Sequence, residues 1–291
     1  MWLRQSLSRY GSRGWKKIVS RLLILQLATS FIVGGAFIAL LSFLAERASE
    51  KTAGMIISLP STAAISLFFI GWTTSPQTIA EIVKLTPLTA AITIVFAAAY
   101  LYLSKLRLAK IPSIIVCTLG SLSVWLVLTP PLAITKFSHL PIALVVYGIV
   151  LCLGYYSITI RSPVAALSQP ITYSTAQKIG RAVFAGSIIA LAVLLSKTLN
   201  PFWGLIISYF PAAYISTFII LHWHHDSQFL FKVWKNSPLG SVVFLSYSLS
   251  AMYTFPAFGI VFGTISAYAV SIAVFMLLQQ RHRLLNMLYP A

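Results

Sequence analysis

The chain has 291 residues, of which 58% are hydrophobic and only 9% are charged, and this composition excludes an ordinary soluble globular protein. Lysine and arginine number 21 against four aspartate and glutamate residues, so the formal net charge is +17. The basic residues are scattered between apolar runs and form no continuous groove with stacking aromatics. This argues against a nucleic-acid partner and favours contact with the anionic headgroups of a lipid bilayer.

Nine apolar runs are long enough to cross a hydrocarbon core of about 30 Å. In chain order they cover residues 22–45, 54–73, 86–104, 112–130, 140–160, 182–198, 203–223, 238–255 and 257–279. Barrel strands alternate in polarity, whereas these runs are continuously apolar, so we expect an all-α polytopic membrane protein with about nine transmembrane helices. The first run follows six Lys/Arg and is longer than a signal-peptide core, which predicts an uncleaved first helix.

The sequence nearly repeats itself. The stretch from Gly35 to Leu88 reappears from Gly186 to Leu239 at a constant offset of 151 residues. The gapless register pairs Gly35 with Gly186, Pro60 with Pro211, Trp72 with Trp223, Gln77 with Gln228, Lys84 with Lys235 and Pro87 with Pro238. Membrane composition alone explains shared Leu, Ile and Ala but not this register, so we infer an internal duplication.

The duplication predicts how the helices are arranged. Each copy supplies four helices and one extra helix at 140–160 lies between them, so the second copy enters the membrane from the opposite side. We therefore expect two four-helix inverted repeats, related by a pseudo-two-fold axis in the membrane plane. The expected organisation is a basic N-terminal segment (1–21), a first repeat (22–135), a linker helix and loop (136–181) and a second repeat (182–291). We place the N-terminus on the cytoplasmic side, following its basic cluster.

Both copies carry a similar motif before a proline. It reads Ala53-Gly54-Met55-Ile56-Ile57-Ser58-Leu59-Pro60 in the first copy and Trp203-Gly204-Leu205-Ile206-Ile207-Ser208-Tyr209-Phe210-Pro211 in the second. With the basic loop at Lys105 to Lys110 and the span containing Leu122-Ser123-Val124-Trp125-Leu126, the duplicated chain resembles the GlpM-like family of small four-helix bacterial inner-membrane proteins. The resemblance implies a multi-pass protein of the bacterial inner (plasma) membrane and transfers no catalytic residue.

The repeated prolines are candidate helix breaks. Pro60 and Pro211 lie inside otherwise continuous spans, where each removes an N–H and frees the carbonyl four residues earlier. In an inverted repeat the two broken helices would face each other near the bilayer midplane, where transporters bind their substrates. The expected substrate path consists of Pro60, Ser61, Thr62, Ser66, Pro211, Tyr214, Ser216 and Thr217. The alternative is that these hydroxyls only re-satisfy the freed carbonyls.

Two further groups of residues are candidate ligand sites. Lys84 and Lys235 each precede a Thr-Pro or Ser-Pro pair that is typical of a helix start, so they could attract anions at opposite mouths of a path. The alternative is that they contact lipid headgroups. At the end of the seventh span lie His222, His224, His225 and Asp226. Because the first copy has no ligands there, we expect an interfacial cluster without a metal.

The remaining ionisable and reactive residues narrow the function. The acidic residues Glu46, Glu50, Glu81 and Asp226 all lie in loops or at span ends, which argues against proton or sodium coupling and against cationic substrates. Cys117 and Cys152 lie inside predicted spans and are expected to be packing residues. Motifs of serine hydrolases, phosphate loops and metalloproteases do not occur, so we expect neither an enzyme nor a cofactor.

The sequence therefore favours a transporter or channel-like protein for a neutral or anionic small solute or a lipid-linked anion. The alternative is a non-catalytic scaffold or accessory subunit of a membrane complex. In either case the partners expected are the bilayer, a small solute, and a second copy of the chain or another membrane protein. A polar cavity near the midplane would favour transport, whereas a solid core would favour the scaffold.

Overall fold

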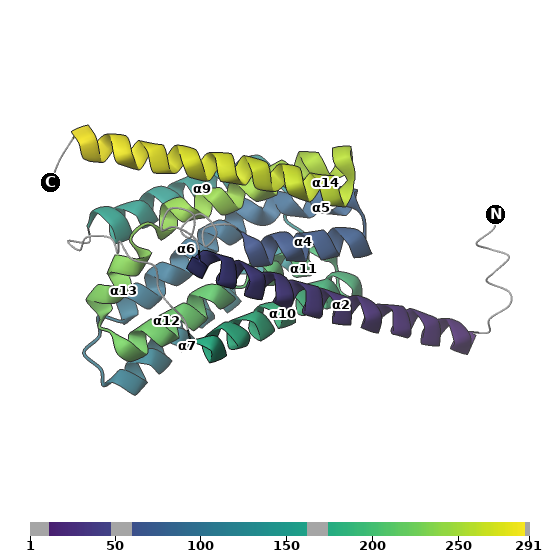
Figure 1. Ribbon diagram of the computed structural model, residues 1–291, viewed down its shortest axis with the longest axis horizontal. Helices are drawn as coiled ribbons and strands as arrows, with labels where there is room; N and C mark the ends of the chain where they lie inside the picture. The colour runs from purple at the N-terminus through teal and green to yellow at the C-terminus, as the bar shows by residue number, and fades with distance from the viewer. Residues whose placement is uncertain (1–11, 48–59, 162–173, 289–291) are drawn as a thin grey trace.

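The computed structural model describes residues 12–47, 60–161 and 174–288, and these residues form helices without any strand. Within these ranges, seven helices are long and apolar enough to cross a membrane, and Ser61–Thr73 is a shorter apolar helix. The longer helices run roughly along the longest axis of the molecule (Figure 1). The chain is therefore a helical, multi-pass membrane protein, as its composition predicts.

The helices follow one another with short connections. The first part of the chain forms α2 (Ser12–Arg47), α4 (Ser61–Thr73), α5 (Pro76–Ile82), the 3-10 turn η1 (Val83–Leu85), α6 (Thr86–Leu103), α7 (Lys110–Leu128) and α8 (Pro130–Ile134). The remainder forms α9 (Leu140–Gly154), the π-helical turn η2 (Tyr155–Ile160), α10 (Thr175–Thr198), α11 (Pro201–Ser208), α12 (Ala212–His224), α13 (Ser227–Trp234) and α14 (Ser237–Leu288). Most bounds lie within a few residues of the predicted spans, with three informative differences.

The first difference is the start of α10. The helix begins at Thr175 and not at residue 182, because Ser174 and Gln177 form a capping box. Ser174 Oγ accepts from the Gln177 N–H at 3.3 Å, and Gln177 Oε1 accepts from the Ser174 N–H at 2.9 Å. The earlier start brings Lys178 and Arg181 into the helix, although the sequence analysis assigns both to the preceding loop.

The second difference concerns the predicted helix start at Thr86 and Pro87. Ser75 caps α5 by accepting from the Thr78 N–H at 3.1 Å, and the chain then stays helical from Pro76 to Leu103. The Thr86 N–H donates to the Val83 carbonyl. In a regular α-helix the residue at position 87 would donate to this carbonyl, but Pro87 has no N–H. Thr86 is therefore the first residue of α6, as the Thr-Pro pair predicts, but it continues a longer bent helix in which η1 is the local adjustment to Pro87.

The third difference is the division of α14. Gly259, with φ 73° and ψ 179°, separates two antiparallel halves, whereas the sequence places the division beside Pro256. Only glycine adopts such a positive φ at low cost, while Pro256 remains inside the helix. The halves pack tightly, because a Cβ on Gly263 would lie 2.9 Å from Phe255 Cα. Thr254 Oγ1 also donates to the Gly263 carbonyl at 3.0 Å.

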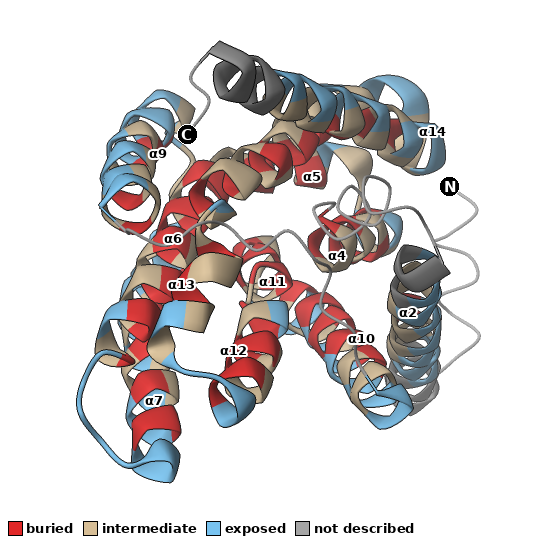
Figure 2. Cartoon of the chain, turned by 60° about the vertical axis from the view of Figure 1, so that its left-hand side comes forward, coloured by how far each residue is buried: buried red, intermediate tan, exposed pale blue. Residues whose placement is uncertain are grey.

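The core draws on most of the helices, and α4 and α6 contribute the largest numbers of buried residues to it (Figure 2). Tyr100 of α6 stacks on Phe218 of α12 with ring centroids 4.1 Å apart, and Phe218 stacks on Trp234 of α13 at 3.9 Å. Cys117 is buried in this core, as a packing role predicts, whereas Cys152 is exposed on α9. Exposed Leu, Ile, Val and Phe side chains cover the outer faces of α2, α9 and α14, as contact with lipid requires.

Helices α2 and α10 pack against each other in opposite directions (Figure 1). Two contacts show the antiparallel direction. Lys197 Nζ of α10 donates to Gln26 Oε1 of α2 at 2.6 Å, and the earlier residue Gly186 of α10 lies against the later residue Gly35 of α2. A Cβ on Gly186 would come within 2.7 Å of the carbonyl oxygen of Phe31. Glycine at this position allows the two backbones to approach closely.

Candidate functional site

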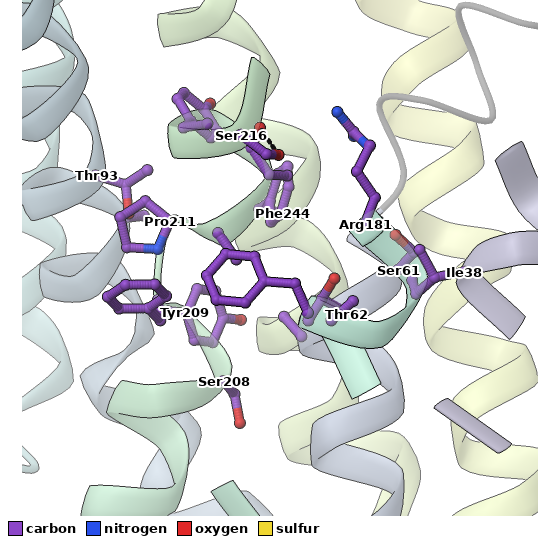
Figure 3. Close-up of a pocket in the computed structure, with 18 of the residues that line it drawn as sticks. Ile38, Ser61, Thr62, Thr93, Arg181, Ser208, Tyr209, Pro211, Ser216 and Phe244 are labelled. Atoms are coloured by element: carbon purple, nitrogen blue, oxygen red, sulfur yellow. Dashed lines mark hydrogen bonds between the residues drawn. The ribbon is translucent and has the colours of Figure 1, made fainter. Parts of the chain in front are cut away.

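A cavity of about 180 Å³ lies where α11 ends and where α4 and α12 begin (Figure 3). Its walls come from α2, α4, α6, α10, α12, the first half of α14 and the bend between α11 and α12. Five residues of the predicted substrate path line it: Ser61, Thr62, Pro211, Tyr214 and Ser216. Such a volume is more than one water molecule needs and suits a small solute.

The helix break predicted at Pro211 is present. Helix α11 ends at Ser208, and Pro211, with φ −76° and ψ 46°, is the N-cap of α12. The carbonyl of Ile207 is not left without a donor, because it accepts from the Phe210 N–H at 3.0 Å. The next bond, from the Ala212 N–H to the Phe210 carbonyl at 2.7 Å, tightens the bend. Proline thus separates α11 from α12 without leaving this carbonyl unsatisfied.

Pro60 has nearly the same backbone angles, φ −75° and ψ 56°, and is the N-cap of α4. The carbonyl oxygens of Pro60 and Pro211 accept from the Ala64 and Ile215 N–H groups at 2.7 and 2.9 Å. Neither cap supplies a side-chain hydrogen bond, so the first-turn N–H groups of both helices have no capping side chain. The predicted motif Ala53–Leu59 lies outside the described residues.

Three hydroxyl groups at the cavity are available to a solute. Ser61 and Thr62 on α4 and Tyr214 on α12 line the cavity, and no described residue forms a hydrogen bond with their side-chain oxygens. Ser216 differs, because its Oγ donates to the Ala213 carbonyl of its own helix at 3.2 Å. Ser216 therefore bonds a carbonyl within α12 and not the one that Pro211 frees, and the other three hydroxyls bond no backbone carbonyl of the described residues.

Of the described residues that line the cavity, Arg181 alone is charged. Its Nη1 donates to Thr217 Oγ1 at 2.7 Å, so the last residue of the predicted path is in contact with this guanidinium. Figure 3 shows Arg181 on the same side of the cavity as Ser61 and Ile38. The predicted span begins at residue 182, so Arg181 was not among the predicted site residues. The capping pair Ser174 and Gln177 is the signal that would have extended the helix back over Arg181.

The rest of the lining is mostly apolar, and its other hydroxyl-bearing residues all form hydrogen bonds within the protein: Thr93, Ser208, Tyr209 and Ser241. Phe184, Phe210 and Phe244 contribute aromatic surface, and Ile38 and Leu41 of α2 contribute aliphatic surface. The sequence analysis assigned none of these five residues to the path, since apolar side chains in a membrane helix carry no distinguishing signal. Together with the guanidinium and the hydroxyls, they give the cavity one charged side and several apolar walls.

The other predicted site residues do not line the cavity. Pro60 begins α4 beside it, and Ser66 is fully buried further along the same helix. Lys84 forms an ion pair with Glu81 at 2.5 Å, next to α5. Lys235 follows α13, and its carbonyl accepts from a neighbouring threonine hydroxyl. Helices α5 and α13, which Lys84 and Lys235 follow in the sequence, lie at opposite ends of the bundle (Figure 1).

The predicted histidine cluster divides into a buried and an exposed part. His222 is buried, with Nδ1 at 3.2 Å from Tyr100 Oη and Nε2 at 3.4 Å from Ser113 Oγ. His225 is exposed, and Asp226 caps α13. Among the residues that the structure describes, no three His, Cys, Asp or Glu side chains are grouped so that they could hold a metal ion. The role that the geometry gives His222 is to join α12 to α6 and α7.

No family model, curated protein or solved structure matches this chain. The function is therefore argued from the cavity. Its polar groups are a guanidinium, hydroxyls and the first turns of two helices, and among the described residues no carboxylate lines it. Such a set can bind neutral or negatively charged solutes by donating hydrogen bonds.

Proposed function

We propose that this protein is an inverted-repeat membrane transporter or channel-like protein for a neutral or anionic small solute or a lipid-linked anion. The observation that carries the proposal is the composition of the cavity wall. It contains five pairs of residues separated by 151 positions: Ser61 and Ala212, Thr62 and Ala213, Ala63 and Tyr214, Ala90 and Ser241, and Thr93 and Phe244. Equivalent residues of two related halves meet at the axis between them, so this pairing supports a solute site on the pseudo-two-fold axis.

The helix bounds support the duplication on which the proposal depends. Helices α4 and α12 both begin and end 151 residues apart, and so do the last residues of α2 and α10, Arg47 and Thr198. The starts of α5 and α13, at Pro76 and Ser227, have the same separation. The shared offset in helix bounds thus extends the correspondence between the copies from residue identities to the positions of whole helices.

The contact between α2 and α10 supports inversion. A Cβ on Gly186 would approach the Phe31 carbonyl oxygen to 2.7 Å, and a Cβ on Gly35 would approach the Ala182 carbonyl oxygen to 3.1 Å. These are reciprocal contacts, since Phe31 and Ala182 are also 151 residues apart. Reciprocal contacts are the mark of a two-fold relation, and because the helices are antiparallel the axis would lie across them, in the membrane plane.

The cavity also favours transport over the scaffold alternative. A scaffold needs packed surfaces for its partner and gains nothing from three cavity hydroxyls that lack a protein hydrogen bond. Ser61, Thr62 and Tyr214 are such groups. A solute that passes through the site would satisfy them in turn.

The resemblance to the GlpM-like family leads us to place the protein in a bacterial inner membrane, with the N-terminus in the cytoplasm. Exposed basic residues at the start of α7, among them Lys105, Arg107 and Lys110, would contact anionic headgroups. The same placement keeps the exposed apolar faces of α2, α9 and α14 in lipid.

Cysteine accessibility tests the topology in a chain whose Cys117 and Cys152 are replaced by Ala. Single cysteines at Lys84 and Lys235 should react with impermeant reagents from opposite sides of the membrane, since one copy is inverted. Labelling of both from the same side would contradict the inversion. A single cysteine at Ser61 should react with a small water-soluble thiol reagent, because it lines the cavity.

Flux through proteoliposomes tests the activity. Vesicles that contain the protein should equilibrate a small polyol or a monovalent anion faster than protein-free vesicles after an osmotic shift. Reaction of Ser61→Cys with a bulky thiol reagent should abolish the difference, while Ser187→Cys on the exposed face of α10 is the matched control. Equal rates with and without protein for every solute would favour the scaffold.

A further inference from the structure

The two copies contribute different side chains to the cavity. Ser61 and Thr62 lie at the start of α4, whereas the equivalent positions at the start of α12 hold Ala212 and Ala213. Figure 3 shows Ser61 and Thr62 on one side of the cavity, away from Pro211. A site for a spherical ion would not require such differences. An asymmetric wall suits an asymmetric solute, with a polar group at one end and an apolar body at the other.

The polar groups that are available to a solute are hydroxyls. The side-chain oxygens of Ser61, Thr62 and Tyr214 form no hydrogen bond with any described residue. The ring of Tyr214 packs against Phe218 and Trp234, with centroids 6.3 and 5.9 Å away, so packing positions its hydroxyl and leaves it available. A hydroxyl both donates and accepts hydrogen bonds, whereas a carboxylate only accepts them. An amide or a hydroxyl of the solute therefore matches this set of groups better than a carboxylate does.

The polar face of α4 extends beyond the cavity. Ser66 follows Thr62 by one helical turn on the same face, and it is fully buried. Its Oγ has no hydrogen-bond partner among the described residues. Buried polar groups nearly always have such a partner, which points to a bound solute or water along this face of α4.

The available groups favour a neutral solute. We assign Arg181 no part in its selection, because the guanidinium is engaged within the protein, by Thr217. A charged group is costly to bring into a membrane interior, and hydroxyls alone do not offset that cost. A neutral amide or hydroxyl loses only its hydrogen bonds to water, which the hydroxyls of Ser61, Thr62 and Tyr214 can replace.

The remaining walls set the size and character of the body. Phe184, Phe210 and Phe244 give aromatic contact surface around a volume of about 180 Å³. A protein cavity of about 150 Å³ with apolar walls holds one benzene molecule. The space therefore accommodates one ring, or an aliphatic chain of similar volume, together with a small head group.

We propose that the cavity binds a small neutral amphipathic molecule, namely an amide or a hydroxyl group on an apolar body of about one ring. The polar group lies at the hydroxyls of Ser61, Thr62 and Tyr214, and the body lies against the three phenylalanines. This inference rests on the proposed function, because it names the substrate class of the same cavity. Solutes are then selected by hydrogen bonding and shape, and not by charge.

Binding of radiolabelled benzamide to the full chain in nanodiscs tests the proposal without reference to flux, with empty nanodiscs as the blank for partition into lipid. Benzamide should bind with a dissociation constant below about 1 mM. Acetophenone has nearly the same shape but lacks the N–H donors, so it should compete about 2- to 10-fold less well. Benzoate has nearly the same shape and a negative charge, and it should compete at least about 10-fold less well. These comparisons use the unaltered protein, so they do not depend on the folding of any variant.

Variants then locate the polar group of the solute. Thr62→Val and Tyr214→Phe each remove one hydroxyl with little change of shape, and each should lower benzamide affinity by about 2- to 10-fold. Thr73→Val is the matched control, because Thr73 is on the same helix as Thr62, outside this cavity, and bonds the Phe69 carbonyl. Unchanged affinity in both cavity variants would overturn the assignment of the polar group. An equal loss in Thr73→Val would overturn it too, because the loss would then not come from contact with the solute.

The outcomes separate the two proposals. If benzoate or acetophenone competes as well as benzamide, or if benzamide does not bind, the neutral hydrogen-bonding ligand is overturned, while solute flux through proteoliposomes still decides whether the protein is a transporter. If benzamide binds as expected but no solute crosses the membrane faster than in protein-free vesicles, the ligand class stands and the transporter proposal fails.

Discussion

Replacing Gly259 by alanine isolates the backbone conformation that divides α14. Gly259 has φ 73° and ψ 179°, a region that is nearly restricted to glycine, and a Cβ built there has no heavy atom within 4 Å. The cost of the substitution is therefore conformational and not steric. Residues held in such regions cost about 1–3 kcal/mol, so Gly259→Ala should lower the free energy of unfolding by that amount.

The control is Gly148→Ala, in the middle of α9. A Cβ there also meets nothing within 4 Å, but the backbone is helical, so alanine should raise stability by about 0.5–1 kcal/mol. Both variants should be compared with the parent chain by equilibrium unfolding in mixed micelles, followed by circular dichroism. Equal stability of Gly259→Ala and Gly148→Ala would refute the assignment of the α14 division to the backbone of Gly259.

Three further substitutions test other parts of the argument. Gly186→Ala places a Cβ 2.7 Å from the Phe31 carbonyl oxygen, so it should destabilise the α2–α10 contact by about 1–3 kcal/mol in the same unfolding assay; an unchanged midpoint would contradict the close approach. Ser75→Ala removes the N-cap of α5 and should cost about 1 kcal/mol, whereas Ser75→Asp should retain most of the stability; equal losses in both would exclude capping as the cause. Lys84→Gln breaks an exposed ion pair with Glu81, so unfolding should change by less than about 1 kcal/mol and solute flux should not change; a large loss of anion flux would restore the predicted role of Lys84.

The helix breaks at the site could be predicted because proline acts locally. Pro211 lacks the N–H that would continue α11, so α11 ends at Ser208 and α12 begins at Ala212. The division of α14 was harder to place. Pro256 was the obvious candidate, but a proline costs a helix one bond and can be tolerated, whereas the reversal of direction at Gly259 needs a φ that the sequence shows only as another glycine.

Only some of the residues that line the cavity could be predicted from the sequence. Ser61, Thr62 and Tyr214 were predictable from their spacing after the repeated prolines, since the register fixes which helix turn they occupy. Arg181 was not, because the predicted span began at residue 182, whereas the capping box of Ser174 and Gln177 starts α10 at Thr175.

The duplication and the asymmetry of the cavity are two aspects of one physical constraint. A symmetric pair of identical four-helix units would place identical side chains on both sides of the axis, so an arginine on one side would face an arginine on the other, and like charges in a membrane interior are costly. Joining the copies in one chain removes that restriction. On this reading, Ser30 could stay a buried serine while its counterpart became Arg181, and Ala212 could lose the hydroxyl that Ser61 carries. Under the proposed duplication, the fused chain can therefore carry unlike side chains at positions that the two copies make equivalent.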